Sequence, residues 1–371
     1  MRGSFRIAGM FSVLFVLMAV ALQPLHAQDG VTLTLDAEFD IGANTAYGCP
    51  HNAVFDAAAD LVWVLMDNCF VHNFTLRAFH AADGTLANPE QDYGDLFEPL
   101  DDQFITTWVN PLARLADGSF DLIYADSVSQ TYDTLNLRIS PESGAVVASE
   151  MPVLDVETLQ SILPGYDYYP ETTIYSRDHR LAAIYEEFAI HVYDLQAETL
   201  RFTLETEAES FGSYVYFSDD GTRLYVAELL NVDDVEDYRS VLSVYSLTDG
   251  ELLETGTVLP TFVLWFSPDG RYAAANINDS ELGVFDLESG TLGNLLPLSE
   301  PPRRVLTCVN RANDMSDVDF MTSGTLPLTD LVWLPDSSGF FTVNSSSGQG
   351  AGGAAVCYFE YSRLRRYSVS P

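Results

Sequence analysis

The sequence predicts an all-β protein, a single β-propeller of six four-stranded antiparallel blades, because two kinds of hairpin alternate along it, six times each. In both kinds, runs that alternate between apolar and polar residues flank a polar turn, often with Asp-Gly or Ser-Gly. Two hairpins make one blade, and six blades across residues 28–371 average ~55 residues each. A β-sandwich is the alternative, but it does not explain the ordered alternation.

The first kind of hairpin places an aromatic residue before a polar turn and a second apolar strand. Its clearest copies are YFSDDGTRLYVAEL from Tyr216 and WFSPDGRYAAANI from Trp265, and weaker copies begin at Val54, Pro111, Ile174 and Val332. The second kind is an alternating strand that ends in a turn, with copies from Phe74, Leu135, Ile190, Leu242, Leu282 and, loosely, Cys357. An additional alternating segment, residues 31–39, precedes the first copy, and we expect it to complete the last blade and close the ring.

Some of these motifs resemble the bacterial WD-repeat-like propellers of the FSPDG type. The resemblance rests on FSPDG at 266–270, VFDLESG at 284–290 and VYSLTDG at 244–250, and it covers nearly the whole chain after residue 27. It implies a propeller that mostly serves as a platform for partners, with a minority of enzymes, and it leaves seven blades as the alternative to six. The Trp-Asp dipeptide is replaced, so the Asp–His network of eukaryotic WD repeats is not implied; the replacements are Tyr193-Asp194, Tyr245-Ser246 and Phe285-Asp286.

The first 27 residues have the three parts of a signal peptide. Arg2 and Arg6 precede an uncharged, largely apolar run at 7–22, and Pro24 and Ala27 precede a polar segment. We expect cleavage near Ala27, a mature domain over 28–371, a secreted or periplasmic location, and no membrane insertion after cleavage. An uncleaved membrane anchor is the alternative, although the apolar run is short for a spanning helix.

The charge of the chain excludes several classes of function. The formal net charge is −37, from 17 basic and 54 acidic side chains, and all 17 basic residues are Arg. Without Lys there is no Schiff-base or Lys general-base chemistry, and so acidic a surface repels nucleic acid. We therefore expect no nucleic-acid partner.

The four cysteines predict two disulfides. Cys49, Cys69, Cys308 and Cys357 are even in number, none forms a CxxC motif, and the expected compartment is oxidising. Three pairings are open. We prefer Cys49–Cys69 and Cys308–Cys357, because these pairs would fasten the connections of the first blade and of the last.

The long connections are predicted to gather on one face of the ring. We letter the strands of a blade a to d from the axis outward, so the a–b and c–d turns lie on one face and the b–c and d–a connections on the other. The turns are tight, whereas the second face receives the long segments 88–103, 151–170, 230–239, 298–328 and 345–356. Rigid scaffolds often bind partners through such loops, although tolerated insertion without function is the alternative.

Two kinds of candidate residue fall on these long connections. Clustered carboxylates could hold Ca²⁺, the one cofactor that we consider, or could form a solvated acidic face; they are Asp233, Asp234, Glu236, Asp237, Asp314, Asp317 and Asp319. Tyrosines could contact a partner or pack the loops; they are Tyr132, Tyr166, Tyr168, Tyr169 and Tyr238. No His has a metal-ligand spacing, and we expect His179, which takes the Gly position of an a–b turn, and His191 to be structural.

These observations predict a secreted, monomeric, non-catalytic propeller that binds a protein or glycan partner through its long-loop face. No catalytic residue is assigned, since there is no GxSxG motif and no α/β pattern that could hold a hydrolase triad. The alternative is a propeller enzyme of the lactonase or sugar-hydrolase type, with carboxylates and a cation at the central channel.

Overall fold

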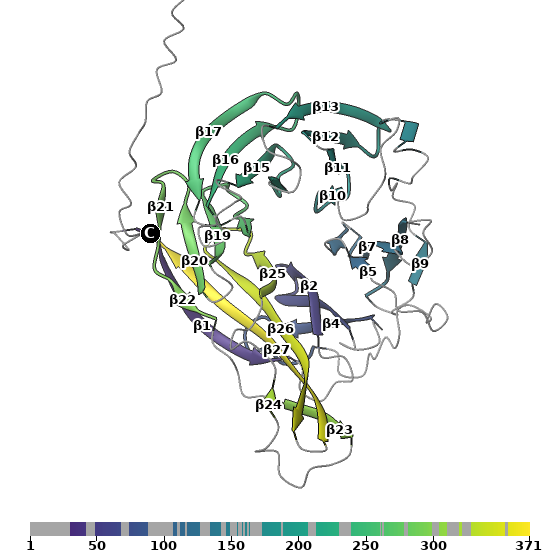
Figure 1. Ribbon diagram of the computed structural model, residues 1–371, viewed down its shortest axis with the longest axis vertical. Coiled ribbons are helices and arrows are strands. Elements are labelled where there is room, and N and C mark those ends of the chain that lie inside the picture. Colours follow the sequence, from purple (N-terminus) through teal and green to yellow (C-terminus); the bar gives the residue numbers. More distant parts are fainter. Residues whose placement is uncertain are drawn as a thin grey trace, which may run out of the picture.

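In the computed structural model the protein folds as a ring of six antiparallel sheets, which Figure 1 shows down the shortest axis of the molecule. The structure describes residues 30–41, 49–67, 74–87, 107–109, 112–115, 117–126, 134–141, 146–148, 154, 158, 160–161, 163, 173–186, 188–206, 213–229, 239–259, 261, 263–277, 281–298, 304–309, 319–320, 328–352 and 355–371. The predicted fold class and the preferred number of blades are confirmed.

The first three blades follow one another along the chain, each from its inner strand outward. Blade 1 contains β2 (Cys49–Asp56), β3 (Leu61–Asp67) and β4 (Phe74–His80). Blade 2 contains β5 (Thr107–Val109), β6 (Ala113–Arg114), β7 (Phe120–Asp126), β8 (Thr134–Ile139) and β9 (Val146–Ala148). Blade 3 contains β10 (Thr173–Tyr175), β11 (Leu181–Glu186), β12 (Ala189–Asp194) and β13 (Thr199–Glu205).

The other three blades complete the ring. Blade 4 contains β14 (Ser213–Phe217), β15 (Arg223–Leu229), β16 (Ser240–Ser246) and β17 (Leu252–Leu259). Blade 5 contains β18 (Leu264–Phe266), β19 (Tyr272–Ile277), β20 (Glu281–Asp286), β21 (Thr291–Leu292) and β22 (Leu296–Pro297). Blade 6 contains β25 (Leu328–Trp333), β26 (Gly339–Gly352), β27 (Ala355–Ser370) and β1 (Thr32–Asp40), and β23 (Arg304–Val309) and β24 (Asp319–Phe320) join its sheet.

The repeated a–b turns owe their shape to one side-chain pattern. In three of them a Ser hydroxyl accepts the backbone N–H of the residue five positions later and donates to the Asp two positions later. These pairs are Ser176–Asp178 (2.7 Å), Ser218–Asp220 (2.6 Å) and Ser267–Asp269 (2.6 Å). The next residue needs a positive φ, which Gly supplies at little cost: φ is 67° at Gly221 and 70° at Gly270.

Four blades depart from the predicted four strands. In blade 2 the inner strand is divided into β5 and β6, and in blade 6 β23 and β24 join the sheet. In blade 1 the outer strand is reduced to a single bridge between Phe79 and Leu86. In blade 5 the outer strand is divided into β21 and β22, and the side chain of Asn294 between them is hydrogen-bonded to β1. The Asn294 side chain accepts the Leu33 N–H at 2.7 Å and donates to the Leu33 carbonyl at 2.9 Å.

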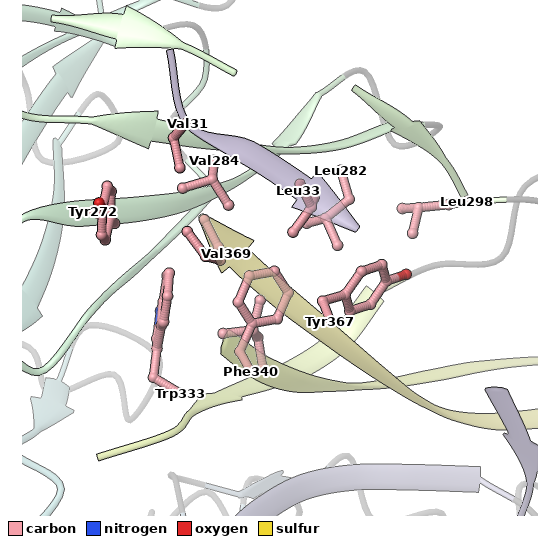
Figure 2. Close-up of a cluster of buried hydrophobic side chains, with 12 residues drawn as sticks. Val31, Leu33, Tyr272, Leu282, Val284, Leu298, Trp333, Phe340, Tyr367 and Val369 are labelled. Atoms are coloured by element: carbon pink, nitrogen blue, oxygen red, sulfur yellow. The ribbon is translucent and has the colours of Figure 1, made fainter. Parts of the chain in front are cut away.

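The N-terminal strand closes the ring, as predicted. β1 is antiparallel to β27 from Thr32↔Ser370 to Asp40↔Arg363, with one bulge, and it is the outer strand of blade 6. Val31 and Leu33 enter a buried cluster with Val284 of β20 and Val369 of β27 (Figure 2). β1 therefore contributes both backbone pairing and apolar contacts to the joint between the two ends of the ring.

The prediction of long loops is wrong in part for two segments, because strands form within them. The segment 345–356 was expected to be a low-complexity loop, but 345–352 extends β26 and 355–356 begins β27. The segment 298–328 was expected to be a d–a loop, but it contains β23 and β24. Ser and Gly residues form these strands because the partner strands on either side satisfy their backbone groups.

Candidate functional site

The longest described segment of the predicted recognition face is a four-stranded arm that extends blade 6. We define the arm as β23, the first half of β27 (355–362), the last half of β26 (345–352) and β24, which lie side by side in that order. In Figure 1 the two long strands continue past the ring, with β23 and β24 beside their far ends. The arm is built from the b–c connection of blade 6 and the d–a connection before it, so both belong to the predicted face.

Most of the predicted site residues lie outside the described residues. This holds for the carboxylates Asp233, Asp234, Glu236, Asp237, Asp314 and Asp317 and for the tyrosines Tyr132, Tyr166, Tyr168, Tyr169 and Tyr238. Asp319 is the first residue of β24, where it opposes Ala351 in the arm. Within the described segments, no three His, Cys, Asp or Glu side chains gather in a way that could hold a metal ion.

Three of the four cysteines lie in described strands. Cys49 begins β2, whereas Cys69 lies outside the described residues. Cys308 lies in β23 and Cys357 in β27, so both belong to the arm.

In three blades the inner strand donates a backbone N–H to a side-chain oxygen of the preceding blade, and the donor has the same position in each of the three strands. The backbone N–H groups of Ala53, Val215 and Leu264 each lie three residues before the residue that starts the a–b turn. The Ala53 N–H donates to Asp330 Oδ2 at 2.8 Å. The Val215 N–H donates to the Tyr185 hydroxyl, and the Leu264 N–H to the Tyr216 hydroxyl. The described inner edge is thus bound to its neighbours by side chains.

Asp330 is the charged member of this set. Its Oδ2 accepts from Ala53 of blade 1, its Oδ1 accepts the N–H of Leu331 at 2.7 Å, and the Trp265 side chain of blade 5 is a third hydrogen-bond partner. Burial raises the pKa of the Asp330 carboxyl, and these donors and the positive charge of Arg177 oppose the rise only in part. The carboxyl therefore connects three blades, and its oxygens are already engaged.

A fully buried polar link joins blades 2 and 3. His179 Nδ1 lies 2.8 Å from Asp121 Oδ2, and both side chains are fully buried. His179 has a φ of 52°, so a residue in the Gly position of the turn sends its imidazole back between the blades. His191 is also buried, with Nδ1 2.9 Å from the Thr203 hydroxyl, and the prediction that both histidines are structural is confirmed.

Neither Asp330 nor Asp121 was predicted from the sequence. A sequence signal exists for both, since each is a carboxylate within an otherwise apolar strand, LTDLVW and FDLIY. Such a carboxylate must find donors when the strand is buried. Their partners could not be named, because those lie in other blades.

Within the described segments, no helix has the length and hydropathy that a membrane span requires. The predicted signal peptide lies outside them.

No protein-family model matches the chain, and no curated protein matches it. Among solved structures, the chain is similar to the β-propeller domain of Cps50 (Swd1) from Myceliophteria thermophila. The identity is 11%, the TM-score is 0.48, and the match covers 88% of this chain and 99% of that domain.

Proposed function

We propose that this protein is a secreted, monomeric, non-catalytic propeller that binds a protein partner through its b–c and d–a face, with the arm as the principal contact. The observation that carries the proposal is that the arm is a folded element that the ring does not need. Blade 6 is completed by β25, β26, β27 and β1, while the arm continues beyond Ser345 and Ser362. A propeller is commonly a scaffold for protein binding, and extra elements on a rigid scaffold are frequent sites of recognition.

The charge of the chain supports a partner with a basic surface. At a net charge of −37, association with a cationic surface is accelerated electrostatically, while copies of this chain repel one another. The proposal includes the acidic segments 233–237 and 314–319, which would contribute negative charge to this surface. They would do so with or without bound Ca²⁺. A glycan partner is the less favoured version, because the charge would add nothing to the binding of a neutral glycan.

The enzyme alternative has weaker support. It requires a carboxylate at the inner strands that can reach a substrate or a cation. Asp330 is an inner-strand carboxylate with a raised pKa, but the Ala53 N–H, the Leu331 N–H and the Trp265 side chain already occupy it. We therefore assign Asp330 to the connection between blades.

The test is removal of the two central strands of the arm, on which β23 and β24 pair. Ser345 and Ser362 are directly opposite each other in the β26–β27 register, so an Asn-Gly turn can replace residues 346–361. This variant also carries Cys308→Ser, because it lacks Cys357. We expect the intact chain to capture a basic partner from the secreted and envelope proteins of its source cell, and the variant to lose at least about 90% of that binding, about 1.4 kcal/mol or more.

The binding experiment is then repeated with the purified partner, with and without a chelator. A matched control carries Glu251→Gln and Glu288→Gln, which lie in c–d turns on the opposite face and leave the arm intact. Equal affinity of the intact chain and the variant for the partner, in a variant that unfolds at the same urea concentration, would overturn the proposal.

A further inference from the structure

We infer that Cys308 and Cys357 form a disulfide that fastens β23 to β27 and holds the arm together. The two residues are Cα partners in the antiparallel register of these strands. They lie in the middle of an uninterrupted run, between Thr307↔Tyr358 and Val309↔Val356, while the bulge in this pairing lies before Thr307. The register therefore places the two cysteines directly opposite each other.

Direct opposition suits a disulfide whichever type of antiparallel pair this is. Opposed residues have Cα atoms about 5.5 Å apart in a hydrogen-bonded pair and about 4.5 Å apart in a non-hydrogen-bonded pair. Disulfides span Cα separations of about 4.4–6.8 Å, so both types fall within the range. Opposed residues also share one face of a sheet, so the bond requires no rearrangement of the backbone.

The position of the bond in the topology gives it a mechanical role. Among the described strands, β23 pairs only with β27, so its attachment to the arm rests on five backbone pairs. The bond closes a loop that contains β24, β25 and β26, and it ties the d–a connection to the c strand. Because cross-linking a loop restricts the unfolded chain, the bond also stabilises the blade that closes the ring.

Formation of the bond requires an oxidant, and the chemistry balances with oxidised glutathione or another disulfide of the same class. The Cys308 thiolate attacks oxidised glutathione, forms a mixed disulfide and releases one glutathione thiolate. The Cys357 thiolate then attacks the Cys308 sulfur of the mixed disulfide and releases the second glutathione thiolate. The two protein thiols lose two electrons and two protons overall, and glutathione disulfide gains them.

Tryptic mapping of the full chain tests the pairing. Because the chain has no Lys, trypsin cuts only after Arg, and Cys308 falls in the peptide 305–311 whereas Cys357 falls in the peptide 312–363. Cys49 and Cys69 share one peptide that ends at Arg77. The protein is reduced, refolded with oxidised and reduced glutathione, alkylated and digested without reductant. We expect 305–311 to be linked to 312–363 and to separate from it after reduction.

Either of two results would overturn the inference: recovery of 305–311 as an alkylated free peptide, or its linkage to the peptide that ends at Arg77. The single variants Cys308→Ser and Cys49→Ser are a matched pair. Cys308→Ser should expose one alkylatable thiol at Cys357, whereas Cys49→Ser should leave the 308–357 linkage intact. The mapping of the unmutated chain decides the matter even where a variant fails to fold, and a chain oxidised in denaturant shows the random mixture of pairings for comparison.

Discussion

His179 shows how one residue serves both a turn and a blade interface. Its φ of 52° meets the backbone requirement of the a–b turn, and its imidazole reaches Asp121 in the neighbouring blade. Gly would meet the backbone requirement better but would remove the link. The positive φ therefore favours Gly at this position, whereas the buried contact with Asp121 favours His, and the sequence has His.

We expect His179→Gly to lower the free energy of unfolding by about 2–4 kcal/mol, because it removes a buried partner of a carboxylate while relieving the backbone. Urea unfolding followed by circular dichroism measures the change. Arg180→Ala, at the next and exposed position, is the control and should change stability by less than about 0.5 kcal/mol. A loss of that small size in His179→Gly would mean that the link stabilises the protein by no more than the relief of the backbone at φ 52° does.

Asp330 should make stability depend on pH in the opposite sense to the turn aspartates. Its folded pKa lies above the ordinary value of 3.8, so between these two values the unfolded chain is deprotonated while the folded chain keeps its proton. The stability that Asp330 contributes is complete below 3.8 and is lost as pH rises through its folded pKa. The turn residues Asp117, Asp249 and Asp336 have lowered pKa values, and their contribution is lost as pH falls.

For this reason we expect Asp330→Asn to gain stability relative to the unmutated chain as pH rises from about 4 toward neutral, and then to level off. Urea unfolding of both chains at a series of pH values gives the difference directly. A difference that is constant with pH would mean that the carboxyl ionises as in the unfolded chain. Asp117→Asn serves as the comparison. As pH falls below 3.8 the unmutated chain loses the contribution of Asp117, so this variant should gain stability relative to it there and show a constant difference at higher pH.

At the scale of the element, β1 carries the closure of the ring. Leu33 is 2% exposed and belongs to the buried cluster shared with blade 5, whereas Leu35, further along the strand, is 44% exposed. Its charged residues add pairing with β27: Arg365 Nε donates to Glu38 at 2.6 Å and Arg363 lies 2.8 Å from Asp40. Gly293 of blade 5 has no room for a Cβ, which would lie 2.1 Å from the Val31 carbonyl oxygen.

Leu33→Ala and Leu35→Ala form a matched pair within this strand. We expect Leu33→Ala to cost about 2–5 kcal/mol, because it leaves a cavity in the joint between the first and last parts of the ring. Leu35→Ala should cost less than about 0.5 kcal/mol. Thermal or urea unfolding measures both, and similar effects of the two substitutions would show that β1 does not occupy the outer position of blade 6 in solution.

At the scale of the whole molecule, the charge of −37 is the dominant property. Like charges repel within the compact state more than in the unfolded chain, and dissolved salt screens them, with a Debye length of about 10 Å at 0.1 M. Ion pairs such as Arg177 with Asp219, 3.5 Å apart, are weak, and 17 Arg side chains cannot neutralise 54 carboxylates.

We therefore expect the thermal unfolding midpoint to rise as NaCl is increased from about 0.01 to about 0.15 M, where the Debye length falls from about 30 to about 8 Å. Differential scanning calorimetry checks the direction. A midpoint that falls with salt would mean that attractive pairs outweigh the general repulsion. The effect of His179→Gly should not change with salt, because buried pairs are screened much less.

The propeller fold, the preferred number of six blades and the closing strand could be predicted from the sequence alone. These follow from local rules, since alternation of apolar residues sets the strands and Asp-Gly turns set the hairpins. The arm, the Asp330 link and the His179–Asp121 pair depend on how segments distant in the sequence pack, and they could not be predicted from it. A Ser- and Gly-rich segment has no apolar period to mark it as a strand, and β26 and β27 extend through it only because β23 and β24 flank them. Similarly, a buried carboxylate is visible in the sequence, but its donors come from other blades, and only the closure of the ring brings them together.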